Sequence, residues 1–335
     1  MRPRVVVLAP AALFRSFFDP PRKRRLSRGF RWQRIARSAP SAGERAVLRN
    51  ADALVTTWDS PRFGEELVDV APRLRLIAHC GGEVKGRFAR GLFSRVTIAN
   101  APGPMAFYVA ELAVAFLLQA ARRLDEHREA LRRPSNRIYE LIHTHGGALE
   151  TLRGRTVGLV GLGRIGRELA RLLRPFGARL LVHDPYVPRA AAARLGAQPV
   201  PLGHLLGRSE FLVLAAALTP ETRGLFDARR LSMLRDGATV VNVGRGGLVD
   251  LDALTSEVRH GRLRCALDVT DPLEPLPPRH PLRRMRGAAL TPHVGAASRV
   301  VRLAMADIVL DTLERFFRGE RLGNRVTTAM LDRMT

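Results

Sequence analysis

The stretch that decides the fold runs from Thr156 to Asp184 and reads TVGLVGLGRIGRELARLLRPFGARLLVHD. Its opening run, Thr156–Val160, is apolar and predicts a buried strand, and Arg179–His183 predicts a second one. The residues between them predict a glycine-rich turn followed by a helix over Arg164–Phe176. A GxGxxG turn that follows a strand and opens a helix is typical of dinucleotide binding.

Each glycine of this turn has a distinct physical task. The first permits the tight turn, the second lets the backbone approach a pyrophosphate, and the third lets helix and strand pack closely. The first free amides of the helix then face the phosphates. Asp184 ends the next strand, 18 residues after Gly166, close to the spacing expected of an acid that binds the ribose hydroxyls. Because such an acid repels a 2′-phosphate, the pattern predicts NAD in preference to NADP. The predicted cofactor-binding residues of this stretch are Gly161, Gly163, Arg164, Ile165, Gly166 and Asp184.

The alternation of strands and helices continues after this stretch. The sequence predicts strands over Phe211–Ala216, Thr239–Val243 and Cys265–Val269, and helices over Leu202–Gly207, Ala228–Leu234 and Leu251–His260. Apolar strands that alternate with amphipathic helices indicate an α/β fold, with a parallel sheet and helices on both of its faces.

The first hundred residues follow the same logic less regularly. Strands are predicted over Val5–Leu8, Ala53–Thr56, Leu76–Ala78 and Val96–Ile98. The basic stretch Pro20–Arg37 predicts a mobile loop and a helix. The apolar run after Arg4 resembles a short signal peptide, but the cleavage-like site falls inside the run, which favours a first buried strand.

The amino-acid composition limits the classes of function and partner that remain. The 335 residues include 55 Lys and Arg against 31 Asp and Glu, a formal net charge of +24, and only two lysines. The arginines are scattered along the chain, which favours a feature of composition over a specific nucleic-acid site; the alternative is a polyanionic partner. Cys80 and Cys265 form no CxxC or metal-ligand spacing, so we expect reduced thiols in a cytoplasmic protein, without a bound metal.

Four blocks of sequence resemble the D-isomer-specific 2-hydroxyacid dehydrogenase family. They are the glycine-rich turn Thr156–Gly166, LTPETRG at Leu218–Gly224, VNVGRGGLVD at Val241–Asp250, and the segment from Leu267 to His293, which contains LDV, EPLP, HPL and TPH. The third and fourth blocks are the most specific. The resemblance implies two Rossmann-like or flavodoxin-like domains with the active site in the cleft between them.

The resemblance also implies roles for individual residues. Arg245 matches the arginine that clamps the substrate carboxylate, a task suited to a planar fork. His293 matches the acid/base that gives a proton to the carbonyl oxygen, and Glu274 the acid that orients it. Asp268 matches the residue that binds the nicotinamide amide. The remaining cofactor-binding residues implied are Thr219, Pro220, Val243 and Gly295.

Two departures from the family pattern bear on the site. Five residues separate Asp268 from Glu274 where four are usual, so Leu273 is interpreted as an insertion and Asp271 is the alternative acid. The glycine-rich loop that would bind the substrate carboxylate contains Gly82, Glu83 and Val84, and Glu83 stands where a small residue is usual. Either Glu83 turns outward to Lys85 or Arg87, or the substrate carries a group that meets it.

The sequence therefore predicts an NAD-dependent oxidoreductase that acts on a small 2-keto or D-2-hydroxy acid. Residues 1–99 and 296–335 would form a discontinuous substrate domain, and residues 100–295 the NAD-binding domain. The apolar stretch from Met105 to Ala121 is interpreted as a buried helix too short to span a membrane, and a homodimer interface is expected at the helix Met105–Arg122. The alternative is an NAD-sensing binding protein similar to the C-terminal-binding-protein corepressors. The short tail argues against phosphoglycerate dehydrogenases that carry a further regulatory domain.

Overall fold

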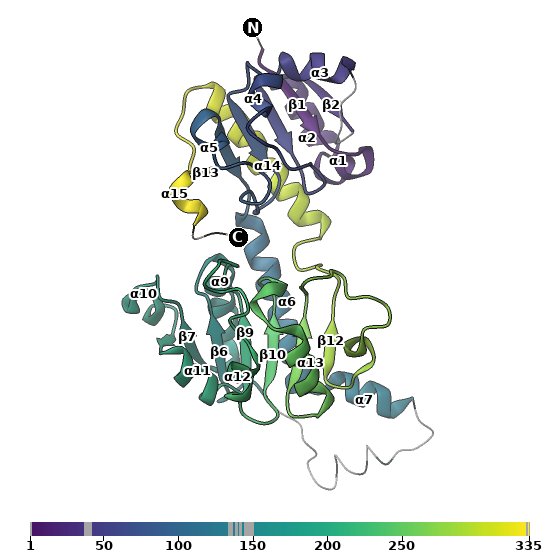
Figure 1. Cartoon of the computed structure of the whole chain (residues 1–335), viewed down its shortest axis with the longest axis vertical. Coiled ribbons are helices and arrows are strands. Elements are labelled where there is room, and N and C mark those ends of the chain that lie inside the picture. The colour runs from purple at the N-terminus through teal and green to yellow at the C-terminus, as the bar shows by residue number, and fades with distance from the viewer. Residues whose placement is uncertain are drawn as a thin grey trace. The chain divides into compact units, whose positions relative to one another are not determined.

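The structure, a computed structural model, describes residues 2–36, 42–132 and 151–332, together with the single positions 137, 140, 143 and 334. The chain divides into two compact units (Figure 1). Unit 1 comprises Met1–Met105 and Ala297–Thr335, and unit 2 comprises Ala106–Ala296.

Unit 1 contains a six-stranded sheet in the order β13-β5-β4-β3-β1-β2. Its strands are β1 (Arg4–Leu8), β2 (Arg31–Ile35), β3 (Ala53–Thr56), β4 (Leu76–His79), β5 (Thr97–Asn100) and β13 (Arg325–Val326). All pairs are parallel except β13 with β5, which is antiparallel. The predicted parallel sheet is therefore mixed in this unit, because the chain returns at its C-terminal end to add an edge strand. Strands β3 and β4 are buried at every residue, as is typical of parallel strands covered on both faces.

The helices of unit 1 are α1 (Ala11–Phe17), α2 (Pro20–Gly29), α3 (Ala42–Arg49), α4 (Leu67–Val70), α5 (Leu92–Arg95), α14 (Arg299–Phe317) and α15 (Thr328–Leu331). The last long helix, α14, packs against α1, α2 and β4. The prediction of a loop and helix over Pro20–Arg37 was wrong in part, because its second half is the edge strand β2. Only Ile35 of this strand is buried, so no apolar run marks it in the sequence.

Unit 2 contains a seven-stranded sheet in the order β12-β11-β10-β9-β6-β7-β8, with every pair parallel. Its strands are β6 (Thr156–Val160), β7 (Arg179–His183), β8 (Ala197–Pro199), β9 (Phe211–Leu214), β10 (Thr239–Asn242), β11 (Arg264–Leu267) and β12 (Ala288–Leu290). The order reverses beside β6, where a doubly wound sheet binds its ligand. The predicted α/β class is confirmed.

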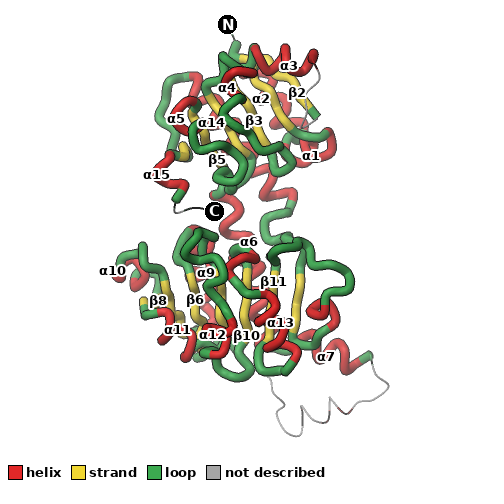
Figure 2. The backbone as a smooth tube through the Cα atoms, viewed as in Figure 1, coloured by secondary structure: helices red, strands yellow, loops and turns green. Residues whose placement is uncertain are grey.

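The helices of unit 2 are α6 (Gly103–Ala121, which begins in unit 1), α7 (Leu124–Leu131), α9 (Arg164–Leu173), α10 (Arg189–Ala193), α11 (Leu202–Arg208), α12 (Ala228–Ser232) and α13 (Leu251–Arg259). Short 3₁₀ turns lie at Arg174–Phe176, Gly246–Leu248 and Pro281–Arg284. In each unit the strands lie side by side, with helices of the same unit around them (Figure 2). The core of unit 2 includes the fully buried Leu212, Val240 and Leu254.

Helix α6 corrects one inference drawn from the sequence. Its 19 residues, with a mean hydropathy of 1.6, are long and apolar enough to cross a membrane by length and composition alone, so length does not exclude a span. The core helix of a soluble protein passes the same test, and α6 buries Val109, Ala113 and Leu117 within the protein.

Candidate active site

The glycine-rich turn between β6 and α9 has the geometry that its sequence predicts. Gly161 has a φ of +94°, and a Cβ there would lie 2.6 Å from the backbone nitrogen of Ala216. A Cβ on Gly166 would lie 2.2 Å from the carbonyl oxygen of Gly161, so only glycine allows α9 to approach the strand. At Gly163 no heavy atom lies within 4 Å of such a Cβ, so the backbone faces open space.

Asp184 lies beside this turn at the end of β7. One carboxylate oxygen accepts from the backbone N–H of Leu162 at 2.7 Å, and the other from that of Tyr186 at 2.9 Å. No side chain caps the first turn of α9, so the amides of Arg164 and Ile165 are open to an anion. Open backbone at Gly163, an uncapped helix terminus and a half-buried acid at the neighbouring strand end together fit a dinucleotide.

The loop after β9 borders the same edge of the sheet. Its two predicted cofactor-binding residues, Thr219 and Pro220, begin a turn that Thr222 stabilises. The Thr222 hydroxyl donates to the carbonyl of Ala217 at 2.7 Å and accepts from the N–H of Thr219 at 2.7 Å. Val243, which follows β10, is buried. The carboxyl ends of β6, β7, β9 and β10 thus present their loops at one edge of the sheet, as parallel strands do.

The structure brings Glu274 and His293 together. Nδ1 of His293 lies 2.7 Å from a carboxylate oxygen of Glu274, and the side chains of His293 and Glu274 are 48% and 34% exposed. The other oxygen of Glu274 accepts from the backbone N–H of Thr270 at 3.1 Å. Leu273, which we interpret as an insertion, projects outward and is 57% exposed. Asp271, the alternative acid, instead pairs with Arg223 at 3.3 Å.

His293 adopts a backbone conformation that few side chains adopt, with a φ of +55°. Its N–H donates to the carbonyl of Asp268 at 2.9 Å. The buried carboxylate of Asp268 accepts three hydrogen bonds from the same turn: from the Thr291 hydroxyl at 2.6 Å, and from the N–H groups of Val294 and Gly295 at 2.7 and 3.0 Å. Asp268 therefore fixes the turn that holds His293, and about one of the four acceptor positions of its carboxylate is left for the nicotinamide amide.

Arg245 follows β10 on a loop that packs against the Glu274 loop. One terminal nitrogen of its guanidinium donates to the Gly244 carbonyl at 2.8 Å, and its own carbonyl accepts from the side-chain amide of Asn242 at 2.9 Å. A Cβ on Gly246 would lie 2.1 Å from the carbonyl carbon of Thr270. Only glycine at position 246 lets the two loops come this close, which explains the first glycine of the Gly246–Gly247 pair.

The predicted substrate loop belongs to unit 1, where it follows β4. Val84 is fully buried, whereas Gly82 and Glu83 are half-buried. The Glu83 carboxylate accepts a short hydrogen bond from the N–H of Gly86. The acid therefore folds back onto its own loop. Its charge also acts on Arg87, whose pKa burial lowers and Glu83 raises.

Sequence reasoning missed several residues that shape these loops. The side chain of Asn242 donates to the carbonyl of Arg245 and accepts from the N–H of Gly244. The N–H of Thr270 donates to Glu274, and its hydroxyl donates to the carbonyl of Leu273 at 2.6 Å. Asn242 is the last residue of β10 and Thr270 follows β11 by three residues, and a polar residue at or near the end of a buried strand was the signal available. His79, at the end of β4, was also missed; burial lowers its pKa to about 3.

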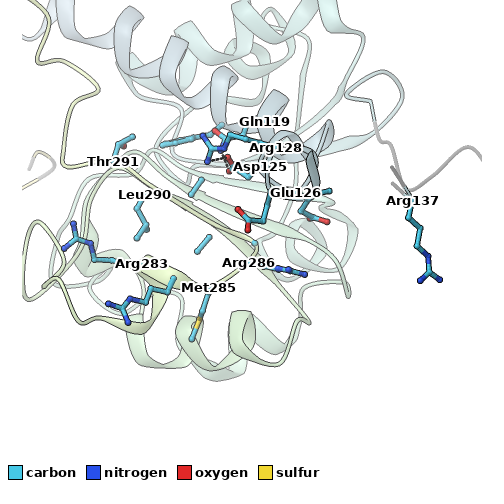
Figure 3. Close-up of a pocket in the computed structure, with 17 residues that line it drawn as sticks. Gln119, Asp125, Glu126, Arg128, Arg137, Arg283, Met285, Arg286, Leu290 and Thr291 are labelled. Carbon is cyan, nitrogen blue, oxygen red and sulfur yellow. Dashed lines mark hydrogen bonds and ion pairs between the residues drawn. The ribbon is translucent and has the colours of Figure 1, made fainter. Parts of the chain in front are cut away.

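A hollow that contains none of the predicted site residues lies elsewhere in unit 2 (Figure 3). It has a volume of about 970 Å³ and is bounded by α6, α7 and the segment around β12. Its lining includes Asp125, Glu126, Arg128 and Glu129 of α7, together with Arg283, Arg284 and Arg286 of the segment before β12. None of the residues that line this hollow is a predicted site residue. Within the described ranges no cluster of three or more His, Cys, Asp or Glu side chains could hold a metal.

The fold and this site define a class of protein: a two-unit α/β protein that binds a dinucleotide and carries an acid-paired histidine. Residues 114–295 match the sequence model described as D-isomer specific 2-hydroxyacid dehydrogenase, NAD binding domain. The chain belongs to this family, and NAD is its cofactor.

Known relatives agree with this placement. A glyoxylate reductase of Korarchaeum cryptofilum is 34% identical, with 82% of each chain covered. A D-3-phosphoglycerate dehydrogenase of Methanocaldococcus jannaschii is 30% identical over 83% of this chain and 52% of the relative. The chain spans about half the length of such phosphoglycerate dehydrogenases. A crystal structure of a Thermus thermophilus protein matches with a TM-score of 0.77 and 31% identity, over 97% of this chain and 100% of the other.

Proposed function

We propose that this chain is an NAD-dependent oxidoreductase that interconverts a small 2-keto acid and the corresponding D-2-hydroxy acid. The observation that carries the proposal is the 2.7 Å contact between Glu274 and His293 in the same unit as the dinucleotide turn. The relatives reported above are named as a reductase and a dehydrogenase, and neither name favours the corepressor-like alternative. Unit 2 would be the NAD-binding domain and unit 1 the substrate domain.

The residues of unit 2 would divide the work. Glu274 orients the His293 ring and stabilises its protonated form, so that Nε2 can give a proton to the carbonyl oxygen of the substrate. Arg245 binds the substrate carboxylate and polarises the keto group. NADH, when bound, supplies the hydride. The cofactor would lie against Gly161–Gly166 with its ribose on Asp184, and against Thr219, Pro220, Val243, Asp268 and Gly295.

In unit 1, the amides of the Gly82–Val84 loop would bind the substrate carboxylate. Two contacts hold the backbone of this loop in place: Val84 is fully buried, and the Glu83 carboxylate accepts from the N–H of Gly86. The Glu83 charge is then neutralised in part by an amide donor, which lowers the cost of placing an anion nearby.

The direct test is a panel of 2-keto acids with NADH. Glyoxylate, hydroxypyruvate and pyruvate are supplied separately, and the fall in NADH absorbance is followed. We expect turnover of at least one, and loss of that turnover in Arg245→Gln. Arg283→Gln, which removes an arginine from the hollow of Figure 3, serves as the control and should retain activity. Absence of turnover with every acid, despite NADH binding, would favour the corepressor-like alternative.

We further propose a cytoplasmic homodimer that binds no specific nucleic acid and no membrane. Phe107 of α6 and Leu124 and Leu131 of α7 are 43%, 55% and 69% exposed. Exposure of such apolar side chains to water is unfavourable, and a second copy of the chain would cover them. The hollow that α7 lines in part contains both acids, such as Asp125, and arginines, such as Arg283, and a surface with both charges suits a self-complementary contact. Leu131→Glu should yield monomers in sedimentation, whereas Leu273→Glu, at a similarly exposed leucine, should not. A monomeric parent protein would refute this proposal.

A further inference from the structure

The sheet of unit 1 reverses its order between β1 and β3, so its crevice for ligands lies at the carboxyl ends of these strands. Trp58 stands two residues after β3, at this edge. The next strand, β4, leads directly into the glycine-rich loop that begins after His79. Two consecutive loops of one sheet edge therefore carry an aromatic side chain and a candidate carboxylate-binding loop.

The turn that carries Trp58 is firmly held. The hydroxyls of Thr57 and Ser60 both donate to the carbonyl of Leu8, at 3.2 and 3.0 Å, and the Ser60 hydroxyl accepts from the N–H of Thr57 at 2.9 Å. The Arg87 guanidinium donates to the carbonyl of Trp58 at 3.0 Å and also to that of Ser60. The position of the indole is thus set by the backbone and does not depend on a ligand.

The indole lies between an aromatic edge and a cation. Phe17 meets it edge-on, with ring centroids 5.4 Å apart. On α14, the guanidinium carbon of Arg302 lies 5.1 Å from the Trp58 ring centroid, which is a cation–π distance. The indole nitrogen also borders the glycine-rich loop, because a Cβ on Gly81 would lie 3.0 Å from it.

Among the described residues, the acids of α14 pair with arginines of another helix, and none of them pairs with Arg302. The acids of α14 are engaged by α2: Arg22 pairs with Asp307, and Arg25 with Asp311 and Glu314. Nε of Arg302 is buried and has no acceptor within the described part of the chain. A buried donor without an acceptor is costly to the protein, and a guanidinium without a carboxylate is a ready partner for an anionic ligand.

We propose that Arg302 and Trp58 form a subsite that binds a second acidic group, at the end of the substrate remote from its 2-keto acid. This inference rests on the proposed function, because the Gly82–Val84 loop is taken to hold the first carboxylate. The chemistry selected is a 2-keto acid that carries a further carboxylate or phosphate on C3 or beyond. Trp58 limits the volume, and Arg302 supplies the charge. Glu83 does not compete for the cation, since it is bonded to Gly86.

Matched substrates test the charge preference. The ratio of kcat/KM is measured for oxaloacetate against pyruvate, and for 3-phosphohydroxypyruvate against hydroxypyruvate. We expect the acidic member of at least one pair to be preferred by about tenfold, the effect of a single charge-assisted contact. The pair with the larger ratio identifies carboxylate or phosphate as the acidic group. Arg302→Gln should remove the preference and leave kcat/KM for the uncharged member within a few-fold.

Arg299→Gln is the control, because it removes an equal charge from the exposed first turn of the same helix. The inference is overturned by a parent enzyme without the preference, by Arg302→Gln with an unchanged ratio, or by an equal loss in Arg299→Gln. If Arg302→Gln does not fold, Arg302→Lys keeps the charge without the planar fork, and the ratio should still fall about threefold.

Fluorescence separates this inference from the proposed function. The chain has two tryptophans, so Trp32→Phe leaves Trp58 as the only indole. Its emission is titrated with D-malate and D-3-phosphoglycerate, and with D-lactate and D-glycerate as uncharged-tail controls. Arg302-dependent quenching by an acidic-tail ligand, in a chain that reduces no 2-keto acid, would refute the proposed function alone. Equal quenching by both classes would refute the subsite.

Discussion

Asp268→Asn tests whether the His293 turn is held by one buried carboxylate. In the parent, that carboxylate accepts three hydrogen bonds from the turn, at 2.6, 2.7 and 3.0 Å. Asparagine presents an N–H group in place of one oxygen, so at least one of the three donors faces another donor. A hydrogen bond to a charged group contributes about 1.5–3 kcal/mol, similar to the roughly 1–3 kcal/mol that a left-handed non-glycine residue costs. The φ of +55° at His293 is then no longer supported.

We therefore expect kcat to fall about 10- to 100-fold, the rate equivalent of that loss. The assay is initial rate at saturating NADH, with KM for NADH measured separately. A positional role lowers kcat with little change in KM, whereas the cofactor contact implied by the family resemblance raises KM for NADH. Asp271→Asn is the control: its exposed pair with Arg223 contributes less than about 1 kcal/mol. An Asp268→Asn enzyme with the parent's kcat, or an Asp271→Asn enzyme equally impaired, would refute the reasoning.

Four further predictions follow from the described geometry. His293→Ala should lower kcat by about 10²–10⁴-fold with NADH affinity in a binding titration unchanged; full activity would remove this histidine from the mechanism. Asp184→Ser should narrow the kcat/KM preference for NADH over NADPH, because the charge that repels a 2′-phosphate is gone, and a parent that prefers NADPH contradicts the assignment. Glu83→Ser should leave kcat/KM for simple 2-keto acids within a few-fold, since the carboxylate already bonds to its own loop; a tenfold rise would show that it faces the substrate. His79 has a pKa of about 3 in the folded chain against an ordinary 6.5, so the unfolded chain binds the extra proton between these values. The free energy of unfolding should fall by about 1.4 kcal/mol per pH unit below pH 6.5 from this group, and His79→Gln should flatten that part of a urea-unfolding series.

The dinucleotide-binding half of the fold was predictable because local pattern and tertiary context agree there. Strands β6 and β7 are apolar runs that the sheet buries, and the turn between them needs glycine for reasons that the backbone alone imposes. At Gly166 the limiting contact is the carbonyl of Gly161, five residues away. A constraint that acts over so short a separation is fully visible in the sequence.

The elements that the sequence did not predict depend on contacts between segments that are far apart in the chain. Strand β2 was missed because an edge strand leaves most of its side chains in solvent. Its Trp32 packs by stacking on Phe14, with ring centroids 5.3 Å apart. Strand β13 pairs with β5 from more than 200 residues away. The Glu274 assignment rested on the EPLP motif and on spacing, and the extra residue between Asp268 and Glu274 disturbs the spacing. The bulge at Leu273 takes up the extra residue outside the His293 contact.

The arginine excess gains a physical meaning from this comparison. Arg262 donates to the carbonyls of Leu231 and Leu234 at 2.8 and 2.9 Å and to Glu257 at 2.6 Å. Arg87 bridges two carbonyls of the Trp58 turn. A lysine has the charge for such contacts but lacks the planar fork that reaches several fixed acceptors at once. Scattered arginines can therefore serve as individual ties between loops, and a net charge of +24 does not require a polyanionic partner. Arg302, whose buried Nε has no acceptor among the described residues, lacks such a tie, and this points toward a ligand.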